Sequence, residues 1–123
     1  PSYVYADRNM IHTVFRNLVS NSIKFTPAEG TISIEAVPKG ELIQVIVKDN
    51  GVGIPLDKQG KLFSFGEFHS TSGTAGEPGT GLGLIICFEF VKKHGSKLSF
   101  DSESGKGTSF TFNLSREEPS LGY

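Results

Sequence analysis

Apolar side chains recur at two different spacings along the chain, and the spacing divides it into helices and strands. A helix is predicted from Asp7, a favourable N-cap residue, to a point before Pro27, which prevents the helix from continuing. One arc of this helix should face a core; it carries Ile11, Val14, Phe15, Leu18 and Ser22. A second helix is predicted from about residue 81 to 94, and its inward arc carries Leu84, Ile85, Cys87, Phe88 and Val91.

Alternation of apolar and polar residues predicts two β-hairpins. Their strands cover residues 31–37, 42–49, 97–102 and 107–114. Residues 56–63 are a candidate for a short helix, and the segment 64–80 is rich in Gly, Ser and Thr and too long for a tight connection. We therefore expect an α+β fold, a two-layer α/β sandwich in which three helices cover one face of a mixed sheet of about five strands.

The composition indicates an ordinary globular domain, but it does not indicate a function. A chain of 123 residues can form one domain with its own core, and a net charge of −1 gives no overall attraction to nucleic acid or to a membrane surface. No apolar run approaches the roughly 20 residues needed to cross a bilayer. The single cysteine, Cys87, excludes an internal disulfide, suits a reducing compartment and is predicted to be a buried packing thiol. Because the chain starts at Pro1, without a methionine, we expect it to be a piece of a longer protein.

Three polar residues of the first predicted helix share one strip of its surface. Asn17, Asn21 and Lys24 are spaced by four and then three residues, so they lie within about 60° of arc beside the apolar face. Amide oxygens are suitable ligands for Mg²⁺, and a lysine one turn further suits a phosphate oxygen. The alternative is an ordinary solvated helix face, and this helix alone favours that alternative.

Two glycine-containing segments are candidates for ligand contacts. In DNGVGIP, Asp49 ends an apolar strand and can accept a hydrogen bond from an exocyclic amine, while Gly51 and Gly53 permit close approach of a ligand. In GTGLGL, residues 79–84, backbone amides precede a helix and form a candidate anion site. The alternatives are a common Asp-Asn-Gly turn and a flexible linker that ends in a helix cap. The second segment fits neither a Walker loop nor a dinucleotide fingerprint.

The order of these segments resembles a known family. The stretches NLVSNSIKFTP, DNGVGIP, LFSFGEF and GTGLGL are similar to the N box, first glycine box, F box and second glycine box of the ATP-binding domain of sensor histidine kinases. That domain belongs to a superfamily shared with gyrase, the heat-shock chaperone ATPases and the mismatch-repair ATPases. The resemblance implies a Bergerat-type ATP-binding fold with a long ATP lid. It assigns residues 1–115 to the catalytic domain and residues 116–123 to a frayed C-terminal tail.

The resemblance also implies a role for each matching residue, with ATP and Mg²⁺ as cofactors. Asn21 would ligate the metal, Asn17 would be a second metal or phosphate contact, and Lys24 would meet the phosphates. Phe25 would lie near the base, and Asp49 would bind the adenine amino group. The remaining implied nucleotide contacts are Gly51, Gly53, Ile54, Phe63, Thr80, Gly81, Leu82, Gly83 and Leu84.

Position 17 separates two branches of this superfamily. The hydrolysing branch has a glutamate four residues before the metal-binding asparagine, as the general base for water. Here that position is Asn17, which cannot take a proton. The resemblance therefore favours transfer of the γ-phosphoryl group to an acceptor, a reaction that relies mainly on positioning and charge neutralisation.

Two features of the family pattern are missing. Many relatives carry an arginine after the F box or in the lid, but residues 64–83 contain no Arg or Lys, and His69 is the only candidate for that charge there. Neither His12 nor His94 has the context of a phosphoacceptor histidine, a helical His followed by an acidic residue. We therefore expect the acceptor on a dimerisation domain that precedes Pro1.

The leading hypothesis is a cytoplasmic kinase domain whose parent protein can be anchored in a membrane. Its implied partners are the dimerisation and histidine-phosphotransfer domain of the same parent, a homodimer through that domain, and a cognate response regulator. No nucleic acid and no direct membrane contact are expected. The alternatives are a non-catalytic nucleotide-binding module of the same fold, an ATP-hydrolysing clamp, and a serine-phosphorylating relative such as an anti-sigma kinase.

Overall fold

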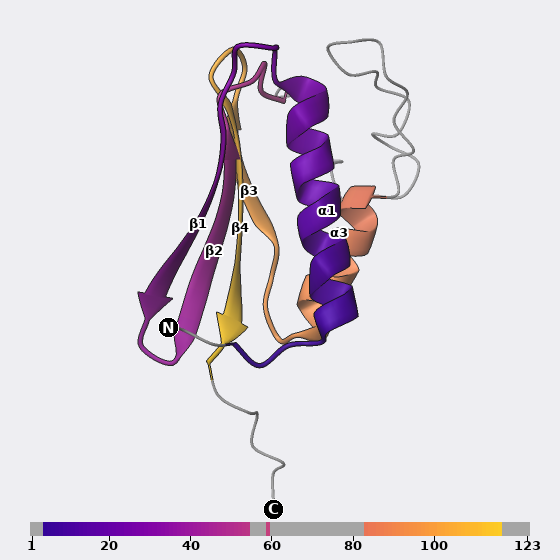
Figure 1. Ribbon diagram of the computed structural model, residues 1–123, viewed down its shortest axis with the longest axis vertical. Coiled ribbons are helices and arrows are strands. Elements are labelled where there is room, and N and C mark those ends of the chain that lie inside the picture. The colour runs from indigo at the N-terminus through magenta and orange to yellow at the C-terminus, as the bar shows by residue number, and fades with distance from the viewer. Residues whose placement is uncertain (1–3, 55–58, 60–82, 117–123) are drawn as a thin grey trace, which may run out of the picture.

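The computed structural model describes residues 4–54, 59 and 83–116. Its elements are α1 (Arg8–Phe25), β1 (Ile32–Lys39), β2 (Leu42–Asp49), α3 (Gly83–Lys93), β3 (Ser99–Glu103) and β4 (Gly107–Ser115). Figure 1 shows two layers, with the sheet on one side and both helices against one of its faces. The predicted two-layer α+β architecture is confirmed.

The sheet has the strand order β1-β2-β4-β3, and each neighbouring pair is antiparallel. The prediction of a mixed sheet is therefore wrong for the described strands. The described residues hold four strands and two helices, so the predicted five strands and three helices are not confirmed. Tyr5 adds a single antiparallel bridge to Ser115, and its N–H donates to the Ser115 carbonyl oxygen at 2.7 Å.

Local signals explain where α1 begins and ends. The Asp7 carboxylate accepts the N–H of Met10 at 2.9 Å, which is the N-cap bond predicted from its residue type. The helix ends at Phe25, and Thr26 takes an extended conformation before Pro27. The buried residues of α1 are Ile11, Val14, Leu18 and Ser22, as the spacing predicts. Phe15, the fifth residue of the predicted arc, is partly buried and packs against the core.

A glycine ends α3. Gly95 has φ of 77°, its N–H donates to the Lys92 carbonyl oxygen at 3.0 Å, and the Ser96 N–H reaches the Val91 carbonyl oxygen at 3.3 Å. This pair of bonds is a Schellman motif, which satisfies the last carbonyl groups of a helix. His94 then connects the two helices, because its Nε2 accepts the Asp7 N–H at 3.0 Å while its Nδ1 lies 2.8 Å from the Phe90 carbonyl oxygen.

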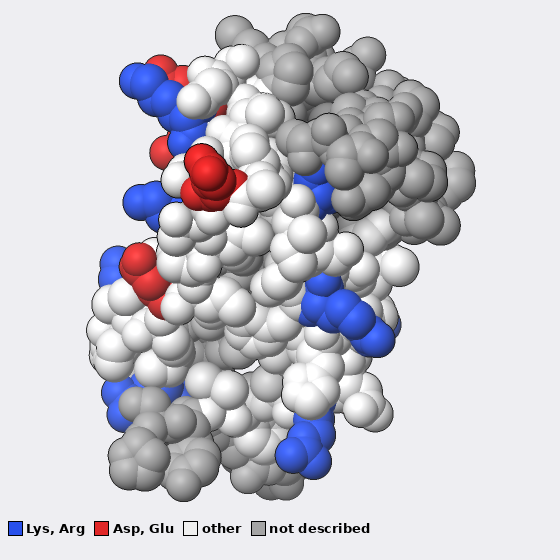
Figure 2. Space-filling model, turned by 45° about the horizontal axis from the view of Figure 1, so that its top comes forward, with Lys and Arg blue, Asp and Glu red and all other residues white. Residues whose placement is uncertain are grey.

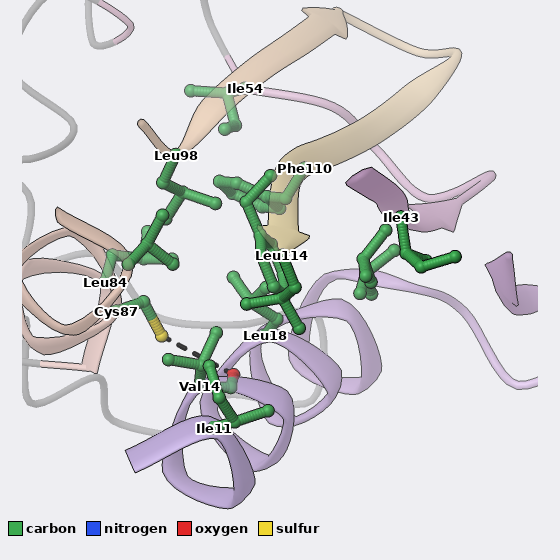
Figure 3. Packing of buried hydrophobic residues seen from close by; sticks show 14 residues of the cluster. Ile11, Val14, Leu18, Ile43, Ile54, Leu84, Cys87, Leu98, Phe110 and Leu114 are labelled. Atoms are coloured by element: carbon green, nitrogen blue, oxygen red, sulfur yellow. Dashed lines mark hydrogen bonds between the residues drawn. The ribbon is translucent and has the colours of Figure 1, made fainter. Parts of the chain in front are cut away.

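The core lies between the sheet and the helices. Directly paired residues of β2 and β4 point to the same side, and the pairs Ile43–Leu114, Val45–Phe112 and Val47–Phe110 are all buried. The other members of the cluster shown in Figure 3 are Ile11, Val14, Leu18, Ile54, Leu84, Cys87, Val91 and Leu98. Neither helix in the described part of the chain has the length and apolar character needed to cross a membrane.

The strand predictions are correct in position, and one turn is shorter than predicted. β2 covers the predicted residues, whereas β1 continues through Pro38 to Lys39, and only Gly40 and Glu41 separate the two strands. A proline is tolerated there because β1 is an edge strand. Of the predicted tail, the described Arg116 donates its N–H to the Glu41 carbonyl oxygen at 2.9 Å.

Cys87 is a packing residue, as its position in the helix predicts. The side chain is fully buried, and its Sγ donates to the Val14 carbonyl oxygen at 3.5 Å, the contact drawn as a dashed line in Figure 3. Burial penalises the thiolate and raises the pKa of the thiol from 9.0 to about 12, although a backbone hydrogen bond partly offsets the shift. A thiol in this state is a poor nucleophile.

This raised pKa predicts a pH-dependent stability. Between pH 9 and about 12 the unfolded chain loses the thiol proton while the folded chain keeps it, so rising pH favours unfolding through this window. The contribution of Cys87 falls by at most about 1.4 kcal/mol per pH unit. Urea unfolding of the wild type and Cys87→Ala across this window measures the effect, and the variant should show the shallower slope. Equal slopes would contradict the assignment.

Candidate functional site

The core-facing positions become polar at one end of the sandwich. Along β2 the inward residues Ile43, Val45 and Val47 are followed by Asp49, and along β4 the inward series starts with Thr108. Ser22 occupies the equivalent end of the inward arc of α1. Figure 1 shows that the end of β2, the β3–β4 turn and the C-terminal end of α1 lie at the same end of the molecule. This end is the candidate site.

Asp49 is the charged group at the centre of this end. Its side chain is only 5% exposed, and its Oδ1 accepts the N–H of Gly51 at 2.9 Å and the N–H of Thr108 at 3.3 Å. A buried carboxylate needs such donors to compensate for lost hydration. No described residue donates to Oδ2, so this oxygen is the one that can accept a hydrogen bond from a bound molecule.

The residues after Asp49, Asn50–Ile54, are called here the 50–54 loop, and they touch both layers. The N–H of Val52 donates to the Phe25 carbonyl oxygen at 3.1 Å, and the Val52 carbonyl oxygen accepts the N–H of Gly105 at 2.7 Å. The loop is thus held between the C-terminal end of α1 and the β3–β4 turn.

The two glycines of this loop are required by close packing. A Cβ on Gly51 would lie 2.2 Å from the Phe25 carbonyl oxygen, and a Cβ on Gly53 would lie 2.2 Å from the Glu103 carbonyl oxygen. Gly53 also has φ of 75°, a conformation that side chains disfavour. The glycines therefore let the loop pack directly on the backbone of Phe25 and Glu103. An ordinary Asp-Asn-Gly turn, the alternative considered above, does not require such packing.

Two buried hydroxyl groups have no hydrogen-bond partner in the described structure, Ser22 Oγ in α1 and Thr26 Oγ1. Thr26 is the residue that follows the helix. Orphaned buried polar atoms cost free energy unless water or a ligand satisfies them. Together with the unused oxygen of Asp49, they make this end of the interlayer space suited to a polar ring with donor and acceptor groups.

The predicted residues of α1 lie next to this end. Asn17 is partly buried and faces the first residue of α3, because a Cβ on Gly83 would lie 3.3 Å from Asn17 Oδ1. Asn21 is partly buried, and the Lys24 ammonium lies 5.2 Å from the centre of the Phe25 ring. The structure thus places Asn17 beside the start of α3.

Some predicted contacts cannot be placed. Phe63, Thr80, Gly81 and Leu82 lie outside the described residues, as do His69 and nearly all of the predicted helix 56–63. Leu84 is described, and its side chain is buried in the core cluster (Figure 3). Ile54 is 5% exposed and lies at the margin of the same cluster, beyond Leu98 in Figure 3.

The sequence interpretation missed several polar residues that complete this end. Ser102 Oγ accepts the N–H of Ile54 at 2.8 Å and lies 2.8 Å from Thr108 Oγ1. Gln59 Nε2 donates to the carbonyl oxygens of Ile54 at 2.9 Å and Ser102 at 3.1 Å. The alternation of apolar and polar residues does contain a sign of these two residues, because Ser102 and Thr108 are polar residues at core-facing positions of their strands.

Fold and site together define a class of domain, an antiparallel α+β sandwich with a polar, glycine-lined end between its layers. Residues 6–118 match the family described as histidine kinase-, DNA gyrase B-, and HSP90-like ATPase. The chain belongs to this family, and the resemblance read from the four sequence motifs is confirmed.

Similar proteins are sensor kinases. The sensor histidine kinase WalK of Bacillus subtilis is 40% identical over 118 residues, which cover 94% of this chain and 19% of WalK. The adaptive-response sensory kinase SasA of Gloeothece citriformis is 38% identical over 112 residues, 90% of this chain and 28% of SasA. The chain therefore spans less than a third of the length of each of these relatives.

Similar solved structures include catalytic domains of histidine kinases, in agreement with the family match. The nucleotide-free catalytic domain of the histidine kinase ThkA is 34% identical with a TM-score of 0.75, and the match covers 92% of this chain and 71% of that one. The mycobacterial sensor histidine kinase MprB is 27% identical with a TM-score of 0.78, and the match covers 91% and 76% of the two chains.

The packing of Gly53 yields a stability prediction. Gly53→Ala adds a Cβ that meets the Glu103 carbonyl group, in addition to the strain of its positive φ, and should cost about 3 kcal/mol or more. Gly105→Ala is the matched control, because Gly105 also has a positive φ but nothing lies within 4 Å of its added Cβ. The control should cost about 1–2 kcal/mol. Urea unfolding measures both, and equal losses would contradict the packing role of Gly53.

Proposed function

We propose that this chain is the ATP-binding catalytic domain of a sensor histidine kinase. It binds Mg-ATP, and the γ-phosphoryl group of the nucleotide is transferred to a histidine on a dimerisation domain outside this chain. The phosphoryl group then passes to a cognate response regulator in two-component signal transduction. The buried Asp49 carboxylate is the observation that carries this proposal: backbone donors hold one of its oxygens, and no residue in the described ranges donates to the other.

The residues at the polar end fit the purine of the nucleotide. Asp49 Oδ2 accepts a hydrogen bond from an exocyclic amino group. The 50–54 loop is held beside this carboxylate because Gly51 and Gly53 pack directly on the Phe25 and Glu103 carbonyl groups. The unpartnered hydroxyl of Ser22 offers a further donor or acceptor at the same end. Adenine carries an amino group where guanine carries a carbonyl oxygen, so this arrangement favours adenine.

The asparagine strip fits a magnesium–phosphate group. Mg²⁺ prefers oxygen ligands and binds proteins together with substrate phosphates. Asn21 and Asn17 would hold the metal, and Lys24 would meet the phosphates. The position of Asn17, whose Oδ1 would lie 3.3 Å from a Cβ on Gly83, supports this assignment, because the glycine-rich segment 79–84 leads into α3 there. When bound, the metal supplies charge neutralisation of the phosphates. The backbone amides at residues 79–84 would add donors to the phosphates.

Asn17 also bears on the fate of the γ-phosphoryl group. An amide cannot act as the general base that hydrolysis of ATP requires, so the described site binds phosphates without activating water. This supports transfer to a histidine over an ATP-hydrolysing clamp. The relatives named above are sensor kinases, which supports the same choice. The proposal includes a cytoplasmic location and a parent that is a homodimer through its dimerisation domain.

A non-catalytic nucleotide-binding module is the second candidate. It is favoured by one observation, the absence of Arg and Lys from residues 64–83 of the sequence, where many relatives carry a cation that clamps the terminal phosphate. In the kinase, either the backbone amides suffice without this charge, or His69 or a residue of a partner domain supplies it. The module instead predicts similar affinities for ATP and ADP and no phosphotransfer.

Asp49→Asn tests the adenine contact with little disturbance of the fold. The amide oxygen still accepts the N–H groups of Gly51 and Thr108, so the amide nitrogen must face the adenine amino group, donor against donor. Loss of a charged hydrogen bond should lower ATP affinity roughly tenfold to a hundredfold. Calorimetric titration measures it, with the exposed Asp101→Asn as the control. Unchanged affinity in Asp49→Asn would refute the contact.

The transfer step is tested with labelled nucleotide. The chain, supplied with Mg²⁺, γ-labelled ATP and a separate fragment that carries a phosphoacceptor helix of a sensor kinase, should label that fragment on histidine. Asn21→Ala should reduce labelling and the Mg²⁺-dependent part of ATP binding, whereas Asn9→Ala, an exposed asparagine at the start of the same helix, should change neither. Tight Mg-ATP binding with no label in any such fragment would favour the non-catalytic module.

A further inference from the structure

A continuous chain of hydrogen bonds runs from Asp49 to the far end of the 50–54 loop. The N–H of Thr108 donates to Asp49 Oδ1 at 3.3 Å, and Thr108 Oγ1 lies 2.8 Å from Ser102 Oγ. Ser102 Oγ in turn accepts the N–H of Ile54 at 2.8 Å. One residue of β3 thus connects the strand that supports the carboxylate with the loop that follows it.

The hydrogen-bonding capacity of the Ser102 hydroxyl is completely used. It has one proton and two acceptor positions. The Ile54 N–H occupies one acceptor position, and the Gly107 carbonyl oxygen, 3.1 Å away, can only accept the proton. The bond between the two hydroxyl groups must then be donated by Thr108. Ser102 therefore fixes the direction of the Thr108 hydroxyl as well as the position of Ile54.

The main chain of the same residue supports the loop a second time. Gln59 Nε2 donates to both the Ile54 and the Ser102 carbonyl oxygens, at 2.9 and 3.1 Å. The Ile54 N–H is therefore bonded directly to the Ser102 hydroxyl. The Ile54 carbonyl oxygen is connected to the Ser102 carbonyl oxygen through the shared donor of Gln59. Because Ile54 is only 5% exposed, a free N–H or carbonyl group there would be costly.

We propose that Ser102 is a positioning residue for nucleotide binding, which acts through Ile54 and Thr108 without touching the nucleotide. This inference rests on the proposed function, since it takes Asp49 and the 50–54 loop as the adenine-side part of the site. Removal of the hydroxyl leaves Ile54 N–H and Thr108 Oγ1 without their shared partner. The loop then loses the geometry that places Gly51 and Gly53 against backbone, while the ladder between β3 and β4 stays intact.

Three variants of the whole chain test the proposal. Ser102→Ala removes the hydroxyl, Ser102→Thr restores it, and Ser99→Ala is the matched control. Ser99 lies on the same strand, is exposed, and donates its hydroxyl proton to the Thr111 carbonyl oxygen at 3.5 Å, away from the site. The measurements are calorimetric titration with ATP and with ADP, with and without Mg²⁺, and hydrogen exchange of the Ile54 amide in the nucleotide-free protein.

Ser102→Ala should weaken ATP and ADP binding by the same factor, about threefold to tenfold for the loss of a supporting hydrogen bond, irrespective of Mg²⁺. The Ile54 amide should exchange faster in this variant, and Ser102→Thr should return both measurements to within about twofold of the wild type. Ser99→Ala should change neither. A merely structural role would lower the unfolding temperature without this selective change in affinity and exchange.

Several outcomes would overturn the proposal. Unchanged nucleotide affinity in folded Ser102→Ala would do so, and so would a loss that appears only with Mg²⁺, since that would place the effect at the phosphates. Failure of the proposed function is seen separately, in the wild type. If the wild type binds ATP but transfers no phosphoryl group, the kinase assignment fails while the affinities of the variants still decide the role of Ser102.

Discussion

The Asp49 carboxylate and its backbone donors are the constraint on which the polar end of this domain depends. An ionised carboxylate between two layers is unfavourable unless donors replace its hydration, and here Gly51 and Thr108 provide them. One donor comes from the loop that immediately follows and the other from the neighbouring strand. The carboxylate therefore fixes the start of the 50–54 loop relative to β4. Its second oxygen, Oδ2, receives no hydrogen bond from the described residues and can accept one from a bound molecule.

The 50–54 loop shows how a short segment can join both layers. Val52 donates its N–H to the last residue of α1, and its carbonyl oxygen accepts from Gly105 in the β3–β4 turn, so a single residue links helix and sheet. The glycines on either side of Val52 lie on backbone carbonyl groups with no room for a side chain. Sequence motifs of this kind are often interpreted through the ligand, but here the packing of the protein itself already requires both glycines.

Much of the fold follows from local signals. Asp7 and Pro27 delimit α1, Gly95 ends α3, and alternation places β2 correctly. The β1–β2 turn was predicted too long because proline normally interrupts a strand, and only the edge position of β1, which depends on strand order, tolerates Pro38. The strand order and the antiparallel pairing of the whole sheet depend on long-range contacts. β4 lies between β2 and β3, and no local sequence pattern indicates this position.

The site was predictable to the extent that its residues are local. Asp49, Gly51 and Gly53 stand out in one short stretch, and the spacing of Asn17 and Asn21 indicates a shared helix face. Ser102 and Thr108 contribute through long-range pairing, and their only sequence signal is a polar residue where the alternation calls for an apolar one. Ser22 is small enough to fit among the apolar residues of the inward arc, so the sequence gives no sign of its unusual state. Only the structure shows that its buried hydroxyl has no hydrogen-bond partner among the described residues.

The place of β4 in the sheet has a consequence for how the domain acquires its structure. β4 is the last of the described strands along the chain, yet it pairs with both β2 and β3 and supplies buried Phe110 and Phe112 to the core. Contacts between residues as far apart in sequence as those of β2 and β4 form slowly, because loop closure precedes any gain from pairing. The core and the support of the Asp49 carboxylate therefore depend on the same late pairing of β4 with β2.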